Sequence, residues 1–216
     1  MLTIIVHNPA TTEIRDFPKG LDNDHLDDLF DTCLRGITNT VNLQSCIWTR
    51  DGSLGSSILL ALLKHRSLQE LEINGRHYGN YDHTILPQFT SIRRVKLIMP
   101  SPPVVEVLPT WLRSLIYPLQ SLSIVCKVRA ALGILSWLIT ELKSKQTSSA
   151  ITDTFLERIS EDLSGLDELH LTGCRRVTHR GLVNALHYNK DGIKSLTIEN
   201  ISPLLVRPYR SLWDDT

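Results

Sequence analysis

Few residues in this sequence have the types and spacing that chemistry requires. The segment G-S-L-G-S-S at 52–57 offers several hydroxyl groups next to glycine. It has neither the Gly-x-Ser-x-Gly order of a nucleophile elbow nor the Gly-Lys pair that ends a phosphate-binding loop, so we interpret it as a turn before a helix. Since no other pairing indicates a nucleophile with its base, we predict no catalytic residues, no cofactor and no enzymatic activity.

Metal-ligating residue types cluster in two places. Four aspartates surround one predicted helix, at Asp24, Asp27, Asp28 and Asp31. They lack the Gly and terminal Glu of a calcium loop, so we interpret them as a solvated acidic face. His170, Cys174 and His179 fall close together, but on a strand His170 should point outward and Cys174 inward. We therefore predict no metal site.

The four cysteines are Cys33, Cys46, Cys126 and Cys174. They are widely dispersed and form no Cys-x-x-Cys pair, so we expect free thiols in a reducing compartment. Cys46 and Cys126 fall in or beside strand patterns, where a buried cysteine acts as a small hydrophobic residue.

Composition excludes several classes of partner. The chain has 216 residues, 42% of them hydrophobic, which suits one domain with a sizeable core. Its 23 basic and 23 acidic residues cancel, so no overall field draws it to nucleic acid or an anionic membrane. The amino terminus does not resemble a signal peptide, and the longest apolar run, 130–139, is about half of what a membrane-spanning helix needs. We expect a soluble protein of the cytoplasm or nucleus.

An internal repeat organises the chain. The apolar triplet Leu166/Leu169/Leu171 recurs at Leu43/Cys46/Trp48, Leu68/Leu71/Ile73, Ile92/Val95/Leu97, Leu119/Leu122/Ile124 and Ile193/Leu196/Ile198. Met1/Ile4/Val6 fits a seventh time. The intervals from 43 to 119 are 25, 24 and 27 residues, and that from 166 to 193 is again 27, which is the period of leucine-rich repeats.

Each repeat predicts one short strand followed by a helix or turn, with the apolar faces buried by stacking. Helical patterns occur at 22–34, 56–65, 104–115, 148–163 and 178–188. Ser56 and Thr178 can cap two of these helices by accepting backbone N–H groups. A doubly wound α/β sheet would need longer apolar strands and a Gly-rich phosphate turn. The predicted fold is therefore an α/β solenoid of about seven strand–helix units, with a parallel sheet on its concave face, forming one domain over 1–216.

The segment L-D-E-L-H-L-T-G-C-R-R-V-T-H-R-G-L-V-N-A-L at 166–186 resembles the cysteine-containing class of leucine-rich repeat, with Val177 and His179 as departures. Together with N-L-Q-S-C-I-W-T-R-D-G-S-L, L-Q-E-L-E-I-N-G and R-V-K-L-I-M-P-S-P-P-V-V-E-V-L-P, it is similar to fungal F-box and leucine-rich-repeat proteins over most of 1–203. The resemblance implies a horseshoe in which Cys174 closes the turn after its strand. It also implies substrate recognition for a Skp/cullin/F-box ubiquitin ligase, although no segment here resembles the F-box itself.

Two segments depart from the repeat. The interval from 119 to 166 is 47 residues, and removing 128–146 restores the period, so we interpret 128–146 as an insertion. It is either a surface amphipathic helix or a retained intron read in frame. Residues 203–216 show no helical return and are interpreted as an irregular tail.

Function is expected on the outward face of the strands, between the buried triplets. Charged residues there form the predicted partner-binding face: Glu70, Glu72, Arg93, Arg94, Lys96, Asp167, Glu168, His170 and Lys194. Neighbouring parallel strands would set acidic beside basic residues, so we expect part of this charge to be paired across strands. The loop R-H-Y-G-N-Y-D-H at 76–83, which holds His77, Tyr78, Tyr81 and His83, is a second, weaker candidate for partner contact, with an ordinary polar loop as the alternative.

We therefore expect a non-enzymatic protein-interaction module that binds a protein ligand, and the resemblance implies that this ligand is a ubiquitylation target. A ligase adaptor is expected as a partner only if a longer product carries an F-box. Two alternatives stay open at this point. One is a small hydrolase or transferase on an irregular α/β fold, and the other is a truncated gene product without function.

Overall fold

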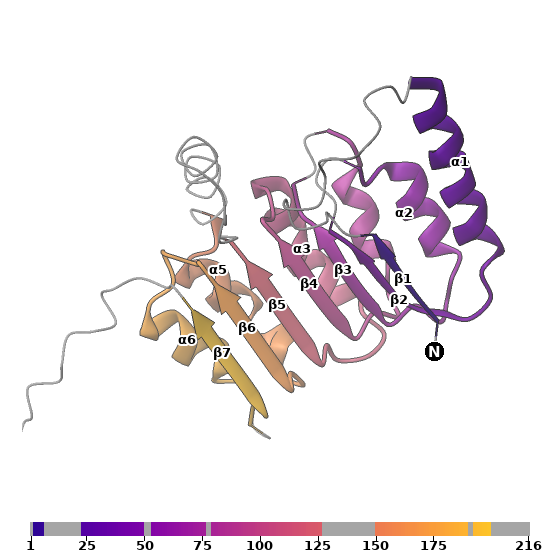
Figure 1. Ribbon diagram of the computed structural model, residues 1–216. Coiled ribbons are helices and arrows are strands. Elements are labelled where there is room, and N and C mark those ends of the chain that lie inside the picture. Colours follow the sequence, from indigo (N-terminus) through magenta and orange to yellow (C-terminus); the bar gives the residue numbers. More distant parts are fainter. Residues whose placement is uncertain are drawn as a thin grey trace, which may run out of the picture.

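Seven parallel strands form one sheet in the computed structural model, which describes residues 2–6, 23–49, 53–76, 79–126, 150–189 and 192–199. The strands are β1 (Leu2–Val6), β2 (Leu43–Trp48), β3 (Glu70–Asn74), β4 (Arg94–Ile98), β5 (Ser121–Val125), β6 (Glu168–Thr172) and β7 (Ser195–Glu199). Their order in the sheet is the order in the sequence (Figure 1). The predicted α/β class, with short parallel strands alternating with helices, is confirmed.

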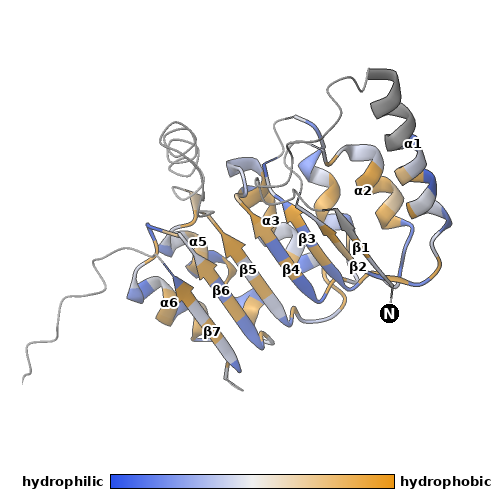
Figure 2. Cartoon of the chain, viewed as in Figure 1, coloured by the Kyte–Doolittle hydropathy of each residue, from blue (hydrophilic) through white to orange (hydrophobic). Residues whose placement is uncertain are grey.

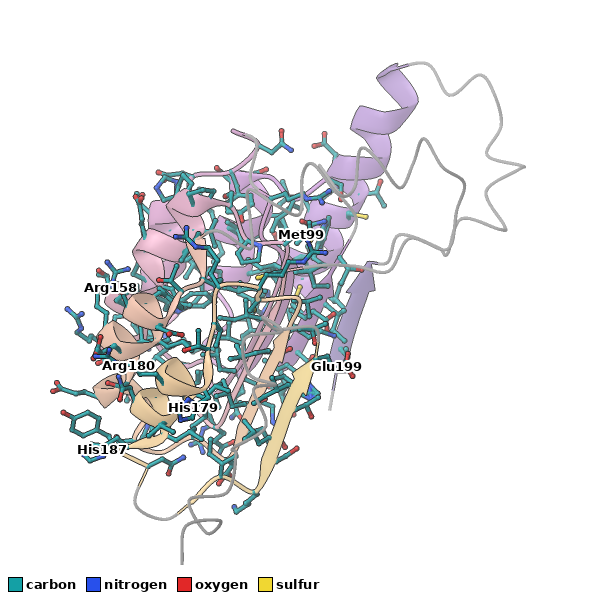
Figure 3. All side chains as sticks on the ribbon, turned by 90° about the vertical axis from the view of Figure 1, so that its left-hand side faces the viewer. Met99, Arg158, His179, Arg180, His187 and Glu199 are labelled. Atoms are coloured by element: carbon teal, nitrogen blue, oxygen red, sulfur yellow. The ribbon has the colours of Figure 1, made fainter. Side chains whose placement is uncertain are left out.

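The helices lie together on one side of this sheet (Figure 1). They are α1 (Asn23–Asn39), α2 (Ser56–Leu63), the 3-10 helix η1 (His83–Gln88), α3 (Pro102–Ser114), α5 (Asp153–Ile159), the 3-10 helix η2 (Glu161–Leu163) and α6 (His179–Leu186). In the view turned by 90°, Arg158, Arg180 and His187 lie on the helix layer, and Glu199 lies on the sheet (Figure 3). Each predicted helical pattern thus corresponds to a helix, and the opposite face of the sheet is open over the residues described.

The core lies between the sheet and the helix layer, and it is built from the repeated triplets. In β2 to β6 and the residues just before them, all of these side chains are at most 4% exposed. Hydrophobic residues recur along each of these strands (Figure 2). The triplet of the last strand differs, because Leu196 is 47% exposed. Within the described part of the chain, no further strand or helix follows β7 to cover it.

One predicted helix cap is confirmed and the other is wrong. The Thr178 side chain accepts a hydrogen bond from the backbone N–H of Arg180 at the start of α6. Ser56 does not cap α2, because the helix begins at Ser56 itself and Gly55 is its N-cap. The Ser56 hydroxyl instead accepts the backbone N–H of Asp82 at 2.8 Å. It therefore ties α2 to the start of η1, which lies a full repeat further along the chain.

Close packing between neighbouring units explains two glycines. A Cβ at Gly75, just after β3, would stand 2.5 Å from the Pro100 Cα, just after β4. A Cβ at Gly181, in α6, would collide with the Asp153 carboxylate. That carboxylate accepts hydrogen bonds from both the backbone N–H and the hydroxyl of Thr178, at 2.7 and 2.5 Å. Only glycine lets α5 and α6 approach this closely.

Several predictions fall on other parts of the chain. The insertion at 128–146 and the tail at 203–216 lie outside the described residues, as does Tyr78. Tyr81 is described and is only 3% exposed, so its side chain is not available for the weaker alternative of partner contact. No helix among the residues that the structure describes is long and apolar enough to cross a membrane.

Candidate functional site

The sheet face opposite the helices, called here the open face, carries its side chains in rows. The parallel register aligns one row across β3 to β7: Glu70, Arg94, Ser121, Glu168 and Ser195. Two residues further along each strand, a second row follows: Glu72, Lys96, Ser123, His170 and Thr197. Because side chains alternate between the two faces of a strand, both rows point away from the core.

A shallow depression, called here the central trough, lies where these rows cross the middle of the sheet. It has a volume of about 290 Å³ and is lined by Glu70, Glu72, Arg94, Val95, Lys96, Ser121, Ser123, Glu168, His170 and Ser195. Its centre runs along β5, where Ser121 and Ser123 have short side chains. The strands on either side carry long charged side chains. The contrast in side-chain length between β5 and its neighbours therefore contributes to the trough.

Ion pairs connect the charged side chains around the trough. Lys96 Nζ lies 2.8 Å from Glu72 Oε1 on the neighbouring strand. Arg94 Nη1 lies 3.2 Å from Glu168 Oε2, and this pair reaches from β4 across β5 to β6. The predicted cross-strand pairing is thus confirmed, and one pair spans a strand.

The Arg94 and Glu168 side chains are 48% and 40% exposed. Exposed ion pairs contribute on the order of 0–1 kcal/mol, because water screens the charges and the side chains lose rotamer freedom. A ligand could therefore replace either partner at little cost.

Three of the predicted site residues lie elsewhere. Arg93, Asp167 and Lys194 each stand directly before a strand rather than in it. The Arg93 guanidinium lies 4.5 Å from the centroid of the Tyr117 ring, in a cation–π contact. Lys194 Nζ pairs with Asp167 Oδ1 at 2.9 Å. These residues mark the amino ends of the strands, and none of them lines the trough.

Some polar groups of the trough have no intramolecular partner. Within the part of the chain that the structure describes, Glu70 and His170 make no hydrogen bond or ion pair, and the same holds for the hydroxyls of Ser121 and Ser123. The lining carries three carboxylates and two cations, so these five groups sum to a charge of −1. The groups available to a ligand are thus one carboxylate, one imidazole and a line of hydroxyls.

Ser121, Ser123 and Ser195 line the trough, but the predicted binding face included only charged residues and left them out. The signal was present, because they occupy the same offsets from their triplets as the charged residues of β3 and β4. The prediction considered only charged side chains and therefore left out the small side chains over which the depression lies.

The remaining groups offer little chemistry. His170 is exposed on the open face whereas Cys174 lies in the core, so the two diverge as expected. Among the described residues, no three histidine, cysteine or acidic side chains gather as metal ligands would. Burial raises the pKa of the Cys46 thiol to about 12, which keeps it protonated and a poor nucleophile at neutral pH.

Comparisons with known proteins assign no family. No protein-family model matches this chain, and no curated protein is similar enough to count as a match. The repeat and the geometry of the open face are therefore the basis for a functional proposal.

Proposed function

We propose that this protein is a non-enzymatic protein-interaction module. In this proposal the chain is a leucine-rich-repeat solenoid of about seven units, shaped as a horseshoe, and its open face binds a protein ligand. The repeat period and the one-sided helix layer support that architecture. The observation that carries the functional part is the central trough. Within the described residues, polar groups without a partner and exposed ion pairs meet there on a sheet face that no helix covers.

The charges of the open face favour selective recognition of a ligand over high affinity. Lys96 and Arg94 are each held by a carboxylate in the free protein, so a ligand exchanges one ion pair for another. Such exchanges change the rate of association and the choice of partner more than the affinity. The half-buried aliphatic residues Ile98 and Val125, further along β4 and β5, add apolar area beside the charged rows.

We further propose, from the resemblance to fungal F-box and leucine-rich-repeat proteins, that the ligand is a ubiquitylation target in the cytoplasm or nucleus. The resemblance is the whole support for this finer part. Long-read sequencing of transcripts tests it. A transcript with an F-box in frame upstream of Met1 would support the proposal of a ligase receptor. Transcripts that begin at Met1 would contradict the ligase proposal but not the proposal of a binding module.

The binding face can be tested with two charge reversals. Lys96→Glu disrupts the trough by adding a fourth carboxylate to its lining, directly beside Glu72. Glu106→Lys changes an exposed residue of α3 in the helix layer. Wild-type protein and both variants would be used to capture partners from the source cells, and each captured partner would then be titrated against purified protein. We expect Lys96→Glu to lose at least tenfold in affinity and Glu106→Lys to bind as the wild type does. The opposite pattern would place binding on the helix layer and contradict the proposal.

A further inference from the structure

Two cysteine thiols meet in the core behind the trough. Cys126 directly follows β5, and Cys174 lies two residues after β6. Both side chains are fully buried, and their Sγ atoms are 3.3 Å apart. The backbone holds the two chain segments together, because the N–H of Cys126 donates to the carbonyl of Thr172 at 2.7 Å.

This geometry is close to that of a disulfide. A disulfide requires an Sγ–Sγ distance of about 2.05 Å. The two sulfur atoms need to approach by little more than 1 Å, which small side-chain rotations supply. Cys46, the other buried cysteine, has no thiol neighbour among the described residues.

We propose that Cys126 and Cys174 are a redox modification site that forms a reversible disulfide between β5 and β6. The oxidant belongs to the class of small disulfides, such as oxidised glutathione. One cysteine thiolate attacks the small disulfide, forms a mixed disulfide and releases one glutathione thiolate. The second cysteine thiolate then displaces the other glutathione, so one S–S bond replaces another and the two cysteine protons end on two glutathione thiols.

The surroundings make this site slow rather than reactive. The thiol contact with Cys126, together with burial, raises the pKa of Cys174 above its ordinary value, so the native thiol stays protonated at neutral pH. Thiol–disulfide exchange therefore requires local opening around β6 and α6, which lie next to the exposed last strand, β7. Once formed, the disulfide is sheltered from reductants by the same burial.

The bond would join residues separated by 48 positions in the sequence. It would also fix the spacing of β5 and β6, the two strands whose side chains line the middle of the trough. Ser121 and Ser123 come from β5, and Glu168 and His170 come from β6. Because the cysteines lie on the core side of the sheet, the inference does not depend on the proposed binding function.

The test uses the whole chain with Cys33→Ser as background, since Cys33 is exposed and would cross-link molecules. The protein is equilibrated with oxidised glutathione, quenched in acid, alkylated in denaturant and mapped by mass spectrometry. We expect two of the three remaining thiols to be lost and one linked pair of peptides, Cys126 with Cys174. The melting temperature of the oxidised form should rise by on the order of 10 °C, and a dithiol reductant should reverse the rise.

Matched variants separate this pair from a general effect of oxidation. Cys46→Ala removes a buried thiol without touching the pair, so it should keep the oxidative shift. Cys126→Ala and Cys174→Ala should each abolish it, and alanine avoids placing a hydroxyl in the core. If either of these two variants fails to fold, peptide mapping of the background protein decides alone. Three free thiols after oxidation, a linkage that includes Cys46, or a lower melting temperature would overturn the proposal.

Discussion

The end of the sheet offers a sharp test of how the repeats stabilise each other. Leu122 of β5 and Leu196 of β7 occupy the same position of their triplets, so the repeat pattern treats them alike. In the structure Leu122 is fully buried, whereas Leu196 is 47% exposed. We predict that Leu122→Ala destabilises the protein much more than Leu196→Ala.

The expected difference follows from burial. Leu-to-Ala substitutions at fully buried sites cost about 3–5 kcal/mol, because the lost transfer energy adds to the cost of a cavity. At Leu196, water can occupy the vacated space, so the cavity cost disappears. Each of the three lost carbon atoms would contribute about 0.8 kcal/mol to the free energy of unfolding if it were fully buried. Because the Leu196 side chain is about half exposed, each contributes about half of that, and the expected total cost is about 1 kcal/mol.

Urea titrations of both variants, followed by circular dichroism, measure these costs, provided that the slope of the transition stays unchanged. Thermal melts should show a loss of about 10 °C for Leu122→Ala and about 3 °C for Leu196→Ala. Equal losses would refute the reasoning, because they would mean that Leu196 is covered in solution as Leu122 is.

Three further predictions concern charge, packing and pH. A double-mutant cycle with Arg94→Ala and Glu168→Ala should give a coupling of about 0.2–1 kcal/mol, which falls as salt is raised. Gly181→Ala should lower the free energy of unfolding by about 1–3 kcal/mol, since the new methyl group collides with the Asp153 carboxylate. Burial raises the pKa of Cys46 from 9.0 to about 12, so above pH 9 the unfolded chain loses this proton while the native protein keeps it. Unfolding experiments at pH 8 to 10 should therefore show stability falling with rising pH, less steeply in Cys46→Val.

Each of these has a control or a contradicting result. A coupling that persists in 1 M salt would show that the ion pair is shielded from solvent. Gly36→Ala is the matched control for the helix glycine, because Gly36 lies in α1 with open space around its Cβ position. It should stabilise the protein by about 0.5–1 kcal/mol. Identical pH profiles of wild type and Cys46→Val would contradict the effect of burial on that thiol.

Much of the open face was predictable, but the trough was not. The alternation around Leu71 and Val95 was sufficient to place Glu70, Glu72 and Lys96 on the outward side. The depression itself depends on the short serines of the next strand, and its depth on how far the neighbouring side chains reach. A pattern of polar and apolar residues does not show how far each side chain extends from the sheet.

The sequence by itself determined where the strands and the α-helices lie and which strand side chains face the core, because periods of 2 and 3.6 are local properties of the chain. The recurrence of Leu-x-x-Leu-x-Leu also set the order of the strands, since each unit can bury its apolar face only against the next. Only the tertiary structure decided that Arg94 pairs with Glu168 across an intervening strand, and that Cys126 meets Cys174 over 48 positions. These contacts depend on distances between separate segments, which the packing of the whole sheet sets and no local pattern encodes.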